Sequence, residues 1–130
     1  MPIIDVCPVV SASRKLPENA AQTIADSISR VLNAKTGRVW VRMTELAAGQ
    51  YAENGATVED NDLPVFVRVL HADWPEENTR SKEAAALAAS VASCLGRQVE
   101  QVHIEYAPPG RGRVLYLRPR GPSATPPRAA

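Results

Sequence analysis

The sequence predicts an α+β domain in which two β-α-β units lie in tandem and share one mixed sheet, with both helices on one face. Short runs rich in Val and Ile alternate with two longer segments of helical character, in the order strand, helix, strand, twice over. A helix that connects two strands favours parallel pairing of those strands, and right-handed crossovers place both helices on the same side of the sheet.

The first unit begins with residues 3–10, a short run in which β-branched residues dominate, as is typical of a strand. A polar loop over residues 11–18 leads into a helix, and Pro17 suits the first helical turn because its missing N–H is no loss there. The expected helix presents one apolar face to the core. That face carries Ala20, Ile24, Ile28, Val31 and Leu32.

The second strand is predicted over residues 38–44, and its side chains alternate between two faces. The segment over residues 47–63, which contains Asn54 and Gly55, is loop-like and has room for a short hairpin. One face of the strand carries Val39, Val41 and Met43, and the other carries Arg38, Trp40, Arg42 and Thr44.

The second unit begins with residues 64–71, a strand that is apolar enough to be central in a sheet. An Ala-rich helix is expected over residues 80–95, because alanine has the highest helix propensity. Asn78 or Thr79 is expected to cap the start of this helix, and Gly96 fits its C-terminal cap.

A fourth strand is predicted over residues 99–106 and a short fifth strand over residues 114–117. We expect one domain over residues 1–120, followed by a Pro- and Ala-rich tail over residues 121–130 that lacks apolar periodicity and is disordered. The sheet face that the helices leave open needs a cover, and self-association supplies one. A symmetric oligomer is therefore expected.

Composition excludes several classes of protein. The 130 residues suit one domain, and a net charge of +1 gives no electrostatic basis for binding nucleic acid or an anionic membrane. The sequence contains no run of ~20 apolar residues and no signal-peptide pattern. The two cysteines, Cys7 and Cys94, form neither a disulfide framework nor a metal-ligand cluster. We expect a cytoplasmic protein with reduced thiols.

The candidate reactive group is Pro2, because no metal-ligand, nucleophile-elbow, phosphate-loop or dinucleotide motif occurs in the sequence. Removal of Met1 would leave a secondary amine on a rigid ring at the start of the first strand. An ordinary α-amino group has a pKa of ~7.7–8.0. Burial and neighbouring cations both disfavour the ammonium form, so Pro2 can serve as a general base at neutral pH.

Two stretches resemble a known family. The start at Pro2 and the stretch over residues 41–51 (VRMTELAAGQY) are similar to 4-oxalocrotonate tautomerase, which begins with proline and carries a like stretch at a matching distance. In element order, the second half is similar to the longer members, cis-3-chloroacrylic acid dehalogenase and macrophage migration inhibitory factor. The resemblance spans roughly residues 2–107 and implies the tautomerase superfamily, whose tandem β-α-β fold assembles into trimers without a metal or organic cofactor.

The resemblance also implies site residues. Pro2 matches the catalytic proline without a gap, Tyr51 falls where the shorter tautomerases hold a pocket aromatic, and Tyr106 matches a fourth-strand tyrosine of the longer members. His71 is expected to border the pocket. Tyr51 and Tyr106, with Trp40, would form an apolar wall that excludes water from the amine.

The resemblance breaks at the carboxylate-binding arginine. The second-strand arginine of the tautomerases aligns with Trp40, so Arg38 or Arg42, two residues to either side on the same face, would have to hold the substrate carboxylate. The helix-1 histidine of the dehalogenase aligns with Ser29, and one of its arginines aligns with Ala72. These departures count against dehalogenation.

We therefore expect a cofactor-independent tautomerase, an isomerase in which Pro2 moves a proton on a small 2-oxo or 2-hydroxydienoic acid, assembled as a homotrimer without nucleic acid or membrane partners. Two alternatives stay open. Pro2 could act as a cationic acid in a hydratase, dehalogenase or decarboxylase of a small unsaturated or 3-oxo acid. Alternatively, the trimer could be a catalytically inactive binding module.

Overall fold

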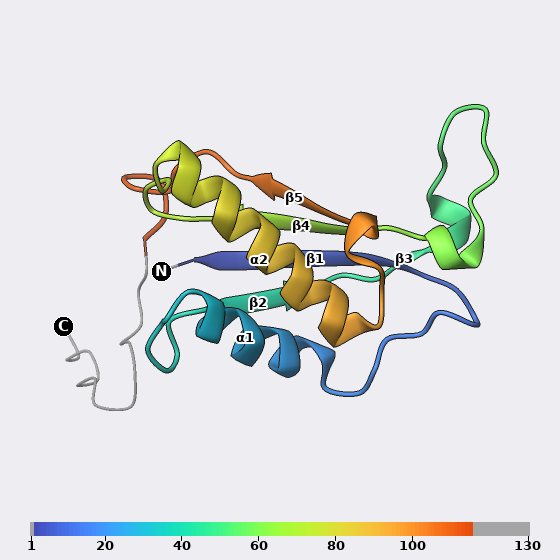
Figure 1. Cartoon of the computed structure of the whole chain (residues 1–130), viewed down its shortest axis with the longest axis horizontal. Coiled ribbons are helices and arrows are strands. Elements are labelled where there is room, and N and C mark those ends of the chain that lie inside the picture. The colour runs from blue at the N-terminus through green and yellow to red at the C-terminus, as the bar shows by residue number, and fades with distance from the viewer. Residues whose placement is uncertain (1, 116–130) are drawn as a thin grey trace.

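The chain folds into two layers in a computed structural model that describes residues 2–115 (Figure 1). One layer is a mixed sheet in which the long strands follow the order β2-β1-β4-β5. The other layer consists of α1 (Ala20–Val31) and α2 (Glu77–Leu95), which lie on the same face of the sheet. The predicted α+β class, element order and placement of both helices are confirmed.

The central strand is β1 (Ile3–Val10), which pairs in parallel with β2 (Trp40–Met43) and antiparallel with β4 (Val65–Leu70). β4 in turn pairs in parallel with β5 (Val102–Tyr106), so each half of the chain has the expected parallel pair. A two-residue strand, β3 (Leu46–Ala47), follows β2 and pairs with the end of β1.

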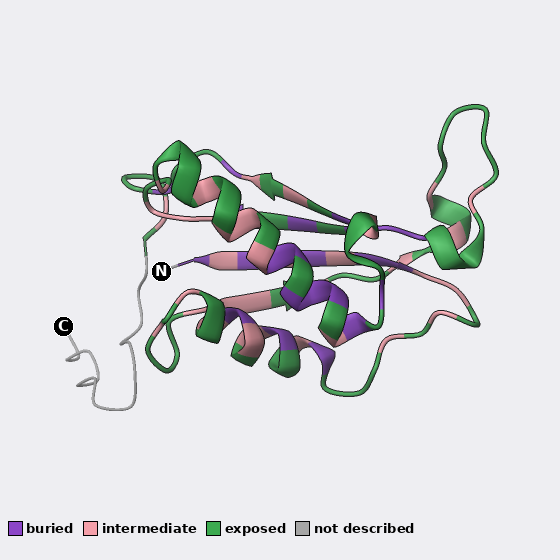
Figure 2. Ribbon diagram, viewed as in Figure 1, coloured by how far each residue is buried: buried purple, intermediate pink, exposed green. Residues whose placement is uncertain are grey.

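The hydrophobic core lies between the sheet and the helices, where alternate strand residues point inward (Figure 2). This alternation is strict in β4, in which every second residue is buried, because its neighbours on the other face meet no helix. The core contains Ile4 and Val6 of β1, Val65, Val67 and Val69 of β4, Ile24 and Ile28 of α1, and Leu87 and Val91 of α2.

The opposite face of the sheet is not covered by a helix and carries a row of alternating charges. In this row Arg42 of β2 is opposite Asp5 of β1, Asp5 is opposite Arg68 of β4, and Arg68 is opposite Glu105 of β5. Phe66 lies on the same face, with 40% of its surface exposed. The face on which self-association was expected is thus open in the single chain.

The start of the first helix differs from the prediction. Asn19, which precedes α1, has a left-handed backbone conformation with φ of 57°, so Pro17 and Glu18 lie before the helix rather than in its first turn. Val31 is 39% exposed and does not join the core face to which it was assigned. The second strand is also shorter than the predicted range of residues 38–44, because the regular pairing with β1 covers only Trp40–Met43.

Boundaries in the second half also differ. α2 begins at Glu77, and its N-cap is Glu76, whose carboxylate accepts a 2.9 Å hydrogen bond from the backbone N–H of Thr79; the predicted caps, Asn78 and Thr79, are wrong. The prediction of Gly96 as the C-terminal cap is confirmed by its φ of 65°. Residues 99–101 form a 3-10 turn rather than the start of the fourth strand.

At the place of the expected hairpin, a single antiparallel bridge joins Glu53 and Ala56 around a tight turn, without paired strands on either side of it in the described chain. Val114 and Leu115 are not part of a strand, so the predicted fifth strand is wrong at these positions. Its remainder, residues 116–117, and the predicted tail over residues 121–130 lie outside the described residues. No helix between residues 2 and 115 is long and apolar enough to cross a membrane.

Candidate active site

Pro2 lies buried at the start of β1, between the beginning of one strand and the end of another. The backbone N–H of Trp40, the first residue of β2, donates a 3.2 Å hydrogen bond to the Pro2 carbonyl oxygen. On the other side, Ile3 is opposite Leu70 in the antiparallel pair of β1 and β4, so Pro2 and His71 occupy the same end of that pair. We call this end of the sheet, where β1 and β2 begin and β4 and β5 end, the Pro2 end.

A half-buried polar cluster also lies at the Pro2 end and consists of His71, Glu83 and Tyr106. Nε2 of His71 lies 2.8 Å from Oε2 of Glu83, and the hydroxyl of Tyr106 donates a 2.5 Å hydrogen bond to the same oxygen. The rings of His71 and Tyr106 stack with their centroids 6.0 Å apart. The structure therefore brings together two predicted site residues, His71 and Tyr106, through an acid that sequence reasoning missed.

Glu83 could have been found from the periodicity of its helix. It lies four residues before Leu87 and eight before Val91, and both of these are fully buried on the inner face of α2. An acidic side chain on this inner face needs hydrogen-bond donors or a cation inside the protein, because a buried charge without such partners is costly in free energy. The Ala-rich sequence around Glu83 predicts a helix but does not indicate which face of that helix meets the sheet.

The environment of Tyr106 keeps its phenol neutral. Burial raises the pKa of this phenol far above its usual range, and the hydrogen bond to Glu83 raises it further, while the nearby Arg80 opposes the rise in part. At neutral pH Tyr106 therefore remains a hydrogen-bond donor and cannot act as a base. In the single chain, the hydroxyl of Tyr106 donates its hydrogen bond to Glu83.

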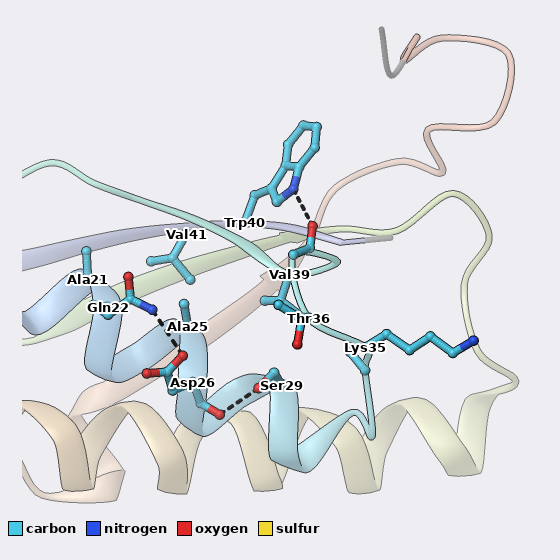
Figure 3. A pocket seen from close by; sticks show the side chains of 12 residues that line it. Ala21, Gln22, Ala25, Asp26, Ser29, Lys35, Thr36, Val39, Trp40 and Val41 are labelled. Carbon is cyan, nitrogen blue, oxygen red and sulfur yellow. Dashed lines mark hydrogen bonds between the residues drawn. The ribbon is translucent and has the colours of Figure 1, made fainter. Parts of the chain in front are cut away.

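A groove of about 560 Å³ runs between α1 and β2 (Figure 3). Trp40 borders it, and the indole N–H of Trp40 donates a 3.0 Å hydrogen bond to the carbonyl oxygen of Gly37. Ser29 of α1 and Lys35 of the following loop also line the groove. Because the backbone of Trp40 bonds to Pro2, this residue links the groove to the Pro2 end.

The two candidate arginines have different surroundings. Nε and Nη2 of Arg42 donate hydrogen bonds of 2.6 Å and 3.0 Å to the carboxylate of Asp5, and this pairing raises the pKa of Arg42. Arg42 lies two residues beyond Trp40, away from the Pro2 end. Arg38 is exposed two residues before Trp40, in the loop from which β2 begins at the Pro2 end. Arg38 is therefore the better placed of the two.

Tyr51 is not near Pro2 in the single chain. Its ring centroid lies 5.9 Å from that of Phe66, and Phe66 is opposite Cys7, five residues further along β1 than Pro2. At ~3.3 Å per residue, the five residues from Pro2 to Cys7 span about 16 Å of β1, so the ring of Tyr51 lies far from Pro2 along the strand. The hydroxyl of Tyr51 donates a 2.6 Å hydrogen bond to Glu53.

The fold is shared with several solved structures, although no protein-family model and no curated protein sequence matches the chain. A symmetric trimer of fused wild-type 4-OT matches with a TM-score of 0.63 and 17% identity over 82% of this chain and 85% of that one. The macrophage migration inhibitory factor of Trichinella spiralis matches with a TM-score of 0.65 and 16% identity over 88% and 96% of the two chains.

A third similar structure is that of Pt0534 inactivated by 2-oxo-3-pentynoate, with a TM-score of 0.59 and 20% identity over 82% of each chain. These likenesses agree with the tandem β-α-β architecture. The chain has the fold of the tautomerase superfamily, which confirms at the level of the fold the resemblance found in the sequence.

Proposed function

We propose that this protein is a cofactor-independent tautomerase whose general base is the amine of Pro2, exposed by removal of Met1. The observation that supports this most strongly is the burial of Pro2 at the start of the central strand, between Trp40 and His71. A buried amine is harder to protonate, because the ammonium form loses its hydration. Pro2 then has a free lone pair at neutral pH without help from a histidine.

The substrate we propose is a small 2-oxo or 2-hydroxydienoic acid. Pro2 nitrogen takes a proton from the carbon next to the carbonyl group, the C–H electron pair forms a carbon–carbon double bond, and the carbonyl oxygen receives the displaced electrons and a proton. Arg38 binds the substrate carboxylate and stabilises the developing enolate. Trp40 and Tyr106 exclude water from the amine.

The active form we propose is a homotrimer. Two of the similar 4-OT structures are described as trimers, one symmetric and one asymmetric. In this chain, the open sheet face with Phe66 and the distance between Tyr51 and Pro2 both support assembly, because a neighbouring subunit would cover the face and could bring its Tyr51 to Pro2. Light scattering should give three times the 14.0 kDa of one chain.

Ketonisation of phenylenolpyruvate or 2-hydroxymuconate by the purified protein tests the activity. We expect turnover in the wild type and its loss in Pro2→Ala. Pro17→Ala is the matched control, because Pro17 is exposed in the loop before α1. Equal turnover in Pro2→Ala and the wild type would rule out Pro2 as the base.

The inactive binding module is a second candidate, favoured by one specific observation. Trp40 aligns with the carboxylate-binding arginine of the tautomerases, and Arg42, two residues further along β2, is held by Asp5. A trimer that binds 2-oxo acids in calorimetry yet never turns them over would support this candidate over the tautomerase.

A further inference from the structure

The acid Glu83 has no part in the reaction proposed above, although it lies at the same end of the sheet. Its side chain is only 12% exposed, and that of His71 is 13% exposed. One carboxylate oxygen contacts both Nε2 of His71 and the hydroxyl of Tyr106. A largely shielded carboxylate with two partners on one oxygen makes the three side chains one hydrogen-bonded unit.

The positions of the protons follow from these contacts. Tyr106 retains its proton and donates it to Oε2 of Glu83. An ionised carboxylate can only accept hydrogen bonds. Opposite such a carboxylate, Nε2 of His71 carries a hydrogen and donates to Glu83, as a metal-ligating or catalytic histidine does to its orienting carboxylate. Nδ1 is then the ring nitrogen that can exchange a proton with a ligand.

The location of His71 connects this unit to Pro2. His71 follows Leu70, which is opposite Ile3, so the imidazole-bearing residue lies beside Pro2 across the antiparallel pair. Arg80, one turn before Glu83 on α2, is the charged group that acts on Tyr106 from the same helix, and its guanidinium lies 4.8 Å from the ring centroid of Trp74. An acid–base group beside Pro2 is placed to exchange a proton with the oxygen of a substrate whose carbon faces the Pro2 nitrogen.

We propose that Glu83 is a positioning residue that holds His71 in the Nε2-protonated form, so that Nδ1 of His71 exchanges the proton at the substrate oxygen. This inference rests on the proposed role of Pro2. In ketonisation, Nδ1 takes the proton of the enol hydroxyl, which leaves an enolate and an imidazolium. That proton passes from the imidazolium to the neutral Pro2 amine through water. The enolate oxygen then re-forms the carbonyl bond while the carbon–carbon π pair takes the proton from the Pro2 nitrogen, so both groups return to their neutral starting state.

The tautomer of His71 gives the first test, and it does not depend on activity. The chain has two histidines, and the second, His103, is exposed on the open face of the sheet, so it serves as an internal reference. Long-range ¹H–¹⁵N spectra at alkaline pH should show His71 in the Nε2–H form. In Glu83→Leu both tautomers of His71 should be populated, with the His103 signals unchanged. An Nδ1–H form in the wild type would overturn the inference, and the wild-type spectrum decides even if the variant does not fold.

Kinetics give the second test. Phenylenolpyruvate ketonisation by Glu83→Leu should show a kcat about 100-fold lower, with KM within about twofold of the wild type, because a lost acid–base group slows the chemical step more than binding. Glu77→Leu, on the exposed first turn of the same helix, should retain the wild-type kcat. Full activity in Pro2→Ala overturns both proposals. Full activity in Glu83→Leu, with Pro2→Ala inactive, overturns only the role of Glu83.

Discussion

The backbone N–H of Trp40 donates a hydrogen bond of 3.2 Å to the carbonyl oxygen of Pro2. Through its backbone Trp40 lies beside the proposed base, while its indole N–H donates a hydrogen bond to the carbonyl oxygen of Gly37 and the ring points away from α1 (Figure 3). In the proposed function this apolar ring keeps water from the amine and so disfavours the ammonium form. The proposed basicity of Pro2 can therefore be tested at this indole.

Replacement of Trp40 should change the pH dependence of catalysis. In Trp40→Ala, water reaches the amine and stabilises its ammonium form, so the pKa of Pro2 rises and the acid limb of the kcat/KM profile moves to higher pH. Trp40→Phe, which retains an apolar ring, should move it less. A wild-type profile that falls toward alkaline pH would contradict base catalysis and would favour the hydratase or decarboxylase alternative, in which Pro2 is the acid.

The two arginines should differ in their effect on substrate binding. We expect Arg38→Ala to raise KM about 10- to 100-fold, since a hydrogen bond to a charged group contributes ~1.5–3 kcal/mol. Arg42→Ala should leave KM within about twofold, because its guanidinium is held by Asp5. The measurement is steady-state ketonisation with both variants in parallel, and the reverse ranking would assign the carboxylate to Arg42.

Gly110→Ala should destabilise the segment that closes the Pro2 end. A Cβ on Gly110 would lie 3.2 Å from Cγ2 of Val114 and 3.4 Å from the carbonyl oxygen of His71, and the Gly110 N–H donates to that oxygen at 2.8 Å. Forced shifts of this kind cost ~1–3 kcal/mol, which urea unfolding measures. At Gly49 the added Cβ meets nothing within 4 Å, so Gly49→Ala is the control, and equal losses in both variants would contradict the prediction.

Arg97→Ala should be among the more destabilising substitutions at the other end of the sheet. The guanidinium is buried and donates to the carbonyl oxygens of Leu63 at 2.9 Å and Val9 at 2.8 Å. Its removal leaves two buried acceptors without these donors, at about 2–4 kcal/mol in the free energy of unfolding. Arg30→Ala, at an exposed position of α1, should change it by less than ~0.5 kcal/mol. A loss below ~1 kcal/mol for Arg97→Ala would show that water replaces both contacts.

Tyr106 should be the last of the described tyrosines to ionise. Its pKa is raised by burial and by Glu83, so the folded state favours the neutral phenol. The resulting stabilisation is complete below the ordinary phenol pKa of ~10 and is lost as the pH rises above it. Ultraviolet titration should show a late, strongly alkaline phase that is missing in Tyr106→Phe and retained in Tyr51→Phe. Ionisation of Tyr106 near pH 10 would contradict its burial against Glu83.

The elements of the fold were predictable where a single periodicity decides them. The run over residues 3–10 coincides with β1, and the alternation around Trp40 places Val41 and Met43 toward the core. Helix starts were less predictable, because they depend on one side chain or one backbone angle. Glutamate is not a preferred N-cap, yet Glu76 reaches the N–H of Thr79.

The candidate site was predictable only in part. Pro2, His71 and Tyr106 were found from sequence, and the structure brings them to one end of the sheet. The role of Glu83 depends on how α2 is rotated against β4 and β5. That rotation brings Glu83 to His71, 12 positions away in the sequence, and to Tyr106, 23 positions away, and the local sequence pattern does not determine it. The place of Tyr51 at the far end depends on the path of the chain after β3 and on assembly.

The most direct measurement of the central claim is peptide mapping after treatment with 2-oxo-3-pentynoate, the compound by which the similar protein Pt0534 was inactivated. An amine adds to the far alkyne carbon and a proton passes to the neighbouring carbon, so the peptide gains the full mass of the reagent. The account predicts one adduct on the nitrogen of Pro2 in the tryptic peptide of residues 2–14, with Met1 absent and ketonisation lost in proportion. An adduct confined to Cys7 in that peptide, or an unmodified peptide that retains Met1, would contradict it.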